Sequence, residues 1–274
     1  MKNTAPYQLH KTLSLCLLSM SLCTVATAQY WQQQVNYTIS VKLDDTLHEL
    51  FGEETMEYIN NSPDELGFIY MHLWPNAYKD RSTALVKQKL GNGSTLLYYA
   101  KPEDRGYIDS LNFMVNGEKV IWEYDKNHID ICKVILNQPL KSGEKITLST
   151  PFHVKIPKGV FSRLGHIGES YQITQWYPKP AVYDKNGWHP IPYLDQGEFY
   201  SEYGSYDVSI TLPENYVAGA TGDLVDGEKE LEWLTKKVEE TKSYVENIGN
   251  KTGSSSIIKI KRRGSEPETD KQDF

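Results

Sequence analysis

Cysteine is scarce in this 274-residue chain, which holds only Cys16, Cys23 and Cys132. The first two fall in a segment that we expect to be removed during export. Cys132 would then remain alone, which excludes an intrachain disulfide from the mature protein. Because Cys132 lies in the alternating run 128–136, the sequence predicts a buried structural thiol and not a nucleophile.

Positive charge is also in short supply. Lys and Arg number 29 against 36 Asp and Glu, which gives a formal net charge of −7. Such a chain has no basic surface able to neutralise a row of phosphates, so nucleic acid and an anionic membrane surface are not expected as partners. Hydrophobic and charged contents of 39% and 24% are typical of a globular protein.

The apolar run at the amino terminus, residues 13–25, is too short to span a bilayer comfortably. Lys2 and Lys11 precede it, and Ala26-Thr27-Ala28 has the form of a signal-peptidase site. We therefore expect residues 1–28 to be a signal peptide and the mature protein to be periplasmic or secreted, with no membrane contact after cleavage. An uncleaved membrane anchor is the alternative.

Alternation of apolar and polar residues predicts an all-β, mainly antiparallel fold of stacked sheets. A strand at 35–43 would turn at Asp44-Asp45 and return along 47–59, where Gly52 marks a bulge or a close approach. A hairpin of 108–115 and 119–124 would turn at Asn116-Gly117, a pair that favours a type I′ turn. Further strands are expected at 66–73, 129–136, 145–156, 171–176, 208–212 and 217–220.

Two helices are predicted, a short one near 77–90 and an amphipathic one near 228–248. The expected domain plan is a β domain at 29–222, a helix and linker at 223–256, and a truncated strand with a disordered tail at 257–274.

The aromatic-rich stretch 171–223 resembles a known family. Thr174-Gln175-Trp176-Tyr177-Pro178, followed by Tyr183-Asp184, is similar to the Gln-aromatic-Glu-Pro signature in the amino-terminal domain of the aminopeptidase N family of zinc metallopeptidases (peptidase family M1). Residues 188–210 resemble secreted bacterial members more closely. The resemblance covers roughly 35–233 and implies the saddle-like amino-terminal domain that lines one side of the substrate cleft.

In that family, zinc is held by a helical His-Glu-x-x-His and a downstream Glu. His48-Glu49 is not followed by the second His, and His153, His166 and His189 do not lie at ligand spacing. We therefore expect no catalytic residue and no metal site on this chain. The resemblance implies that zinc, the peptide substrate and the missing catalytic domain belong to the intact enzyme, and that this chain, cut short before that domain, is inactive alone.

The resemblance implies two substrate-binding candidates, Gln175 and Tyr177. Gln175 matches the family's cleft-facing Gln, although ordinary hydrogen bonding at a strand end is the alternative. Tyr177 stands where the family has a Glu that holds the substrate's α-amine, and a neutral phenol forms no ion pair with an ammonium group. Either another carboxylate supplies that anchor, or the intact enzyme selects free amino termini differently.

The same stretch holds other polar and aromatic candidates. Four carboxylates are interpreted as solvated loop charges, with a calcium site or an acid/base pair as the alternative: Asp184, Asp195, Glu198 and Glu202. His189 is expected to be a packed, hydrogen-bonded imidazole.

The aromatic residues either pack in the core or line a cleft: Trp176, Trp188, Tyr193, Phe199 and Tyr200. A competing hypothesis is a stand-alone exported β-sandwich that binds glycans through such aromatics, above all Trp176 and Trp188. A purely structural or interaction module is a third possibility.

Overall fold

A computed structural model describes residues 30–225 and 227–251. The predicted signal peptide at 1–28, with Cys16 and Cys23, and the predicted tail at 257–274 lie outside these residues. Contacts divide the chain into two units, one ending at Glu214 and the other beginning at Asn215. Each unit is described by itself.

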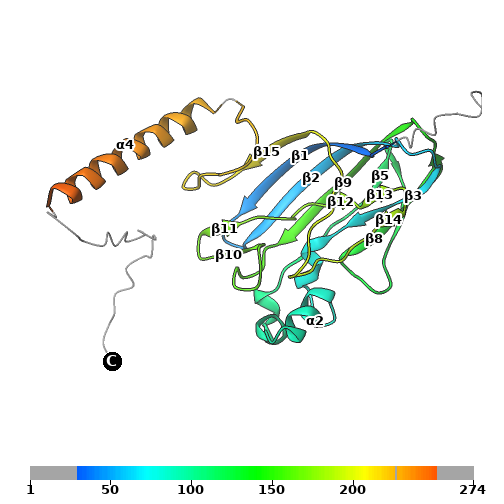
Figure 1. Cartoon of the computed structure of the whole chain (residues 1–274), viewed down its shortest axis with the longest axis horizontal. Coiled ribbons are helices and arrows are strands. Elements are labelled where there is room, and N and C mark those ends of the chain that lie inside the picture. Colours follow the sequence, from blue (N-terminus) through cyan, green and yellow to red (C-terminus); the bar gives the residue numbers. More distant parts are fainter. Residues whose placement is uncertain (1–29, 226, 252–274) are drawn as a thin grey trace, which may run out of the picture. The chain divides into compact units, whose positions relative to one another are not determined.

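The first unit is built around two β-sheets, so the predicted all-β, mainly antiparallel class is confirmed (Figure 1). The seven-stranded sheet has the order β15-β1-β2-β9-β5-β6, and β4 pairs with β9. Its strands are β1 (Gln34–Asp44), β2 (Glu49–Ile59), β4 (Tyr107–Asp109), β5 (Met114–Val115), β6 (Glu118–Lys119), β9 (Lys145–Lys155) and β15 (Tyr206–Thr211).

The second sheet has four strands in the order β12-β3-β8-β7. They are β3 (Leu66–His72), β7 (Ile121–Tyr124), β8 (Ile131–Leu140) and β12 (Lys179–Pro180). Two small hairpins complete the strands, β10 (Gly165–Ile167) with β11 (Ser170–Gln172), and β13 (Val182–Asp184) with β14 (Gly187–His189).

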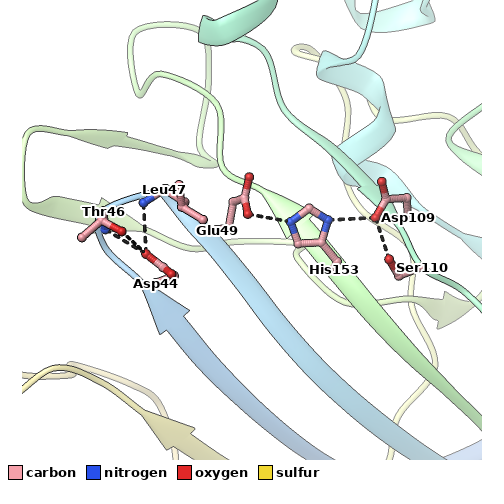
Figure 2. A network of polar contacts seen from close by, with 7 residues as sticks. All are labelled: Asp44, Thr46, Leu47, Glu49, Asp109, Ser110 and His153. Carbon is pink, nitrogen blue, oxygen red and sulfur yellow. Dashed lines mark hydrogen bonds and ion pairs between the residues drawn. The ribbon is translucent and has the colours of Figure 1, made fainter.

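The long strands β1, β2 and β9 follow the predicted alternation, with every second side chain in the core. The predicted turn after β1 is present: the carboxylate of Asp44 accepts hydrogen bonds from the backbone N–H of Thr46 and that of Leu47, each at 3.0 Å (Figure 2). Pairing of β1 with β2 is regular through Gly52, so this glycine is no bulge. It marks a close approach, because an added Cβ would lie 2.3 Å from the ring of Phe152.

The predicted hairpin at 108–124 is only partly correct. Asn116 and Gly117 have φ of 51° and 83°, as a type I′ turn requires. The paired strands β5 and β6 are only two residues long, and β7 pairs with β8 in the other sheet. Phe113 and Val120 are both buried, and the N–H of Val120 still donates to the carbonyl of Phe113 at 3.3 Å, so the chain passes into the other sheet only after Val120.

Two other strand predictions need correction, and a third is confirmed with a pairing that the sequence did not indicate. Residues 173–176 are not in a strand, and the expected strand 171–176 is reduced to β11. Residues 217–220 form no strand either and are exposed. β15 is confirmed near 208–212, but it runs parallel to β1, with Tyr206 opposite Tyr37.

The short helix predicted near 77–90 begins later. Residues Trp74–Tyr78 form a buried 3-10 turn (η1), and α2 spans Ala84–Gly91. The side chain of Asp80 accepts from the N–H of Ser82 at 2.6 Å, and Thr83 then caps α2 by accepting from the N–H of Val86 at 3.4 Å. These local bonds separate the two segments. Two shorter elements follow, α3 (Leu96–Tyr99) and η2 (Pro102–Asp104).

The first unit holds two clusters of buried apolar side chains. The larger cluster fills the space between the two sheets, and the smaller one surrounds Trp74, Tyr78 and α2. Ile173 and Trp176 pack against both clusters, so the segment that contains them lies where the clusters meet.

The second unit consists mainly of α4 (Glu228–Lys251), which confirms the helix predicted near 228–248. Its apolar residues Leu231, Leu234, Val238 and Val245 are largely exposed. Among the helices in the described ranges, none has both the length and the apolar content needed to cross a membrane.

Candidate functional site

The segment 173–178, between β11 and β12, carries both predicted substrate contacts. Its backbone pairs with no strand, and packing of Ile173 and Trp176 against both apolar clusters holds it in place. Gln175 has a φ of 54°, a left-handed conformation that few residues other than glycine adopt. Core packing therefore holds an irregular backbone in a defined shape, which suits a binding segment.

The side chain of Gln175 is held by a lysine that sequence reasoning missed. The Nζ of Lys179 donates a hydrogen bond to Oε1 of Gln175. The same Nζ lies 4.0 Å from the ring centroid of Trp74, in a cation–π contact. Lys179 stands between two prolines in an otherwise apolar run, and this pattern is the signal that would have indicated its burial.

Lys179 is 5% exposed, and no carboxylate forms an ion pair with it among residues 30–225 and 227–251. Burial without a counter-charge lowers the pKa of Lys179 from 10.5 to about 7. His72 lies opposite Lys179 in the β3–β12 pair. Burial, with the charge of Lys179, lowers the pKa of His72 to about 3, so this imidazole is neutral and its Nε2 accepts from the N–H of Ile191 at 3.1 Å.

Tyr177 contacts a different group of residues. Its hydroxyl donates to the hydroxyl of Tyr206 at 3.3 Å, and its ring meets Tyr37 edge to face at 5.6 Å. Burial raises the pKa of Tyr177, and the hydrogen bond with Tyr206 raises it further. The phenol is therefore neutral, and it does not share a hydrogen-bond partner with Gln175.

Glu54 on β2 is a second residue that sequence reasoning missed. It is 2% exposed, and its two carboxylate oxygens have no hydrogen-bond partner among the described residues. Burial raises its pKa well above the usual value, and its charge would raise the pKa of Tyr37 and that of Tyr177. Because both oxygens are enclosed, Glu54 is not placed to anchor a ligand's amine. The sequence signal for its burial was the alternation of β2, in which Glu54 falls on the same face as the apolar residues of that strand.

The four loop carboxylates do not converge on one site. Asp195 forms an ion pair with Lys89 at 2.7 Å, whereas Oδ1 of Asp184 lies 2.8 Å from Nε2 of His189. The interpretation of Glu202 as a solvated charge is wrong, because it is 7% exposed and accepts from the N–H of Tyr183 at 3.1 Å. Burial raises the pKa of Glu202 to about 7.

His189 is hydrogen-bonded, as predicted, but it is half-buried at a hairpin and is not in the core.

The aromatic residues of the stretch pack mainly inward. Trp176 and Trp188 are half-buried against the core between the sheets, and Tyr193 is 1% exposed. Phe199 and Tyr200, with Trp74, line a cavity of about 60 Å³. Both indoles that the glycan hypothesis requires are thus in contact with the core.

The histidines in the described part of the chain do not build a metal centre. His153 lies between two carboxylates, with Nδ1 at 2.8 Å from Asp109 and Nε2 at 3.1 Å from Glu49 (Figure 2). His48 and His166 stack at 3.6 Å, and Nδ1 of His48 lies 2.6 Å from the hydroxyl of Tyr171. No group of three His, Cys, Asp or Glu in the described part of the chain is placed to hold a metal ion. The arrangement of these histidines does not fit a catalytic zinc.

Cys132 is buried as predicted, and burial raises the pKa of its thiol. A thiol that resists ionisation is a poor nucleophile, which agrees with a structural role.

Comparison with known proteins finds similarity only among solved structures; no protein-family model and no curated protein matches the chain. An M1 zinc metallopeptidase from Deinococcus radiodurans is similar, with 15% identity and a TM-score of 0.39 over 71% of this chain and 35% of that one. Native leukotriene A4 hydrolase from Saccharomyces cerevisiae has 13% identity and a TM-score of 0.26, over 50% and 18% of the two chains.

The chain thus spans about a third of the length of the M1 structure.

Proposed function

We propose that this chain is the amino-terminal, substrate-side domain of an exported zinc metallopeptidase of the M1 family, with aminopeptidase activity in the intact enzyme. In this proposal the chain does not hydrolyse peptides by itself; the support is that the sequence contains no His-Glu-x-x-His, the motif that holds zinc in this family. Zinc and the general base would be supplied by the catalytic domain, which is the partner implied here.

The observation that supports this proposal is the placement of Gln175. It belongs to the run 174–210 that resembles the family, and it lies in an irregular segment held by two apolar clusters. Binding residues that sit on an ordered loop over a rigid scaffold need little reorganisation when the ligand arrives. Gln175 therefore has the setting expected of a residue that contacts an extended peptide.

The first test is an assay of the purified chain with alanine p-nitroanilide, with and without added zinc. We expect no turnover in either case. Turnover by a homogeneous preparation would contradict the proposal.

The second test restores the partner. The genomic sequence downstream of Phe274 is read in three frames for His-Glu-x-x-His, and the encoded polypeptide is joined to this chain. We expect zinc-dependent aminopeptidase activity. In the joined enzyme Gln175→Ala should raise KM more than it lowers kcat, because a ground-state contact is lost. Gln172→Ala is the matched control, since Gln172 is an exposed glutamine three residues earlier. An inactive joined enzyme, or equal effects of both variants, would contradict the proposed role.

A further inference from the structure

The contact between Lys179 and Gln175 determines which end of the glutamine amide faces outward. A glutamine amide has an oxygen that accepts and a nitrogen that donates two N–H bonds, whereas an ammonium group only donates. The oxygen Oε1 must therefore face Nζ of Lys179, as the structure has it. An inverted amide would place N–H against ammonium and leave both groups without an acceptor.

The amide nitrogen is the other polar end of the Gln175 side chain. Within the described residues it has no hydrogen-bond partner, and it is not one of the enclosed side-chain atoms that lack one. Gln175 itself is half-buried. Its Nε2 is thus open to solvent and presents N–H donors, which can bind an oxygen acceptor but cannot bind an ammonium group.

We propose that Lys179 is a positioning residue, which fixes the amide of Gln175 so that its N–H donors point outward and bind an oxygen acceptor of the ligand. A peptide carbonyl and a carboxylate share this chemistry. That the ligand is a peptide rests on the proposed function, whereas the orientation of the amide rests only on residues of this chain.

The state of Lys179 controls this orientation. The groups around its ammonium are Gln175, the ring of Trp74 and the neutral His72, and no carboxylate pairs with it in the described ranges. Burial lowers the pKa of Lys179 to about 7. Once it loses its proton, the amine can accept as well as donate, so the constraint on the amide of Gln175 is released.

The first experiment follows the side-chain amide of Gln175 by NMR in the full chain, with its resonances assigned from their loss in Gln175→Glu. We expect these resonances to shift with pH at the midpoint of Lys179, which is read from its own side-chain signals. Lys179→Met should shift them as well. Lys133→Met is the matched control, because Lys133 makes a similar cation–π contact, 3.9 Å from the ring of Phe68, away from Gln175.

Resonances of Gln175 that stay constant across the midpoint of Lys179 would overturn the positioning role. This measurement uses the unaltered chain, so the test holds even where Lys179→Met fails to fold.

The second experiment identifies the acceptor with three probes: N-acetyl-trialanine methylamide, which has only neutral amides; trialanine methylamide, which has a free amino terminus; and sodium acetate. We expect the acetylated peptide to shift the Gln175 amide and to bind about fivefold more weakly to Lys179→Met, the factor for one hydrogen bond of about 1 kcal/mol. A shift by acetate alone would assign the site to a carboxylate and overturn its use for peptide carbonyls.

The two proposals fail in different ways. An inactive joined enzyme with an amide that still follows Lys179 would remove the peptidase assignment and keep the positioning role. No shift by any of the three probes would overturn the recognition of an oxygen acceptor.

Discussion

Replacing Lys179 by methionine should make the protein more stable at neutral pH. The lysine is 5% exposed and lacks an ion-pair partner among the described residues, so its charge is removed from water without compensation by a counter-charge. A pKa lowered from 10.5 to about 7 corresponds to roughly 5 kcal/mol of cost at and below pH 7. Methionine keeps the apolar stem and fills a similar volume.

Two favourable contacts oppose this cost. The cation–π contact with Trp74 is worth about 2 kcal/mol in a desolvated place, and the charged hydrogen bond to Gln175 is worth about 1.5–3 kcal/mol. The cost of burying the charge is still slightly larger than the free energy of these two contacts together. We therefore expect Lys179→Met to be more stable than the wild type by about 1 kcal/mol at pH 7.

The pH dependence is the stronger test. Between pH 7 and pH 10.5 the unfolded chain binds a proton at Lys179 that the folded chain does not bind, so the stability of the wild type rises with pH across this window. The methionine variant lacks this rise. Its advantage should therefore disappear and reverse toward pH 10.5, where the wild type is neutral and keeps its hydrogen bond.

The assay is urea unfolding followed by tryptophan fluorescence and circular dichroism at several pH values from 7 to 10.5. Lys133→Met, which removes the comparable contact over Phe68, is the control for loss of a cation–π contact. A stability difference between Lys179→Met and the wild type that does not change with pH would refute the reasoning.

Three further predictions concern the core. Glu54→Gln should match the stability of the wild type near and below pH 4.5 and exceed it as pH rises, because burial raises the pKa of Glu54 and the unfolded chain ionises first. Equal urea midpoints at all pH values would argue against this. Gly52→Ala should cost about 1–3 kcal/mol in thermal unfolding, since the new Cβ would lie 2.3 Å from the ring of Phe152, and an unchanged melting temperature would show that the ring moves freely. Tyr177→Phe should change stability by no more than about 1 kcal/mol, because only the 3.3 Å hydrogen bond to Tyr206 is lost, and a larger loss by calorimetry would reveal a contact beyond this pair.

Local patterns predicted much of the fold. The alternation in β1, β2 and β9, the turn at Asp44 and the Asn116-Gly117 turn all depend on residues close in sequence, so they could be predicted from sequence alone. The amphipathic spacing of α4 was sufficient for the same reason.

Pairings between distant segments could not be predicted in this way. β15 pairs parallel to β1 across more than half of the first unit, and the 108–124 hairpin divides its residues between two sheets. Such choices follow from which arrangement buries the most apolar surface, and this quantity depends on the whole chain.

For the candidate site, the sequence by itself indicated Gln175 and Tyr177 through their resemblance to a family motif, together with an ordered aromatic stretch around them. Only the tertiary structure brought Lys179 onto Trp74 and Gln175 and enclosed Glu54 where its charge would act on Tyr37 and Tyr177. The physical reason is that a residue's type determines whether it is charged in water. Its surroundings determine how much water and which partners it keeps, and those surroundings exist only once strands far apart in the chain have packed together.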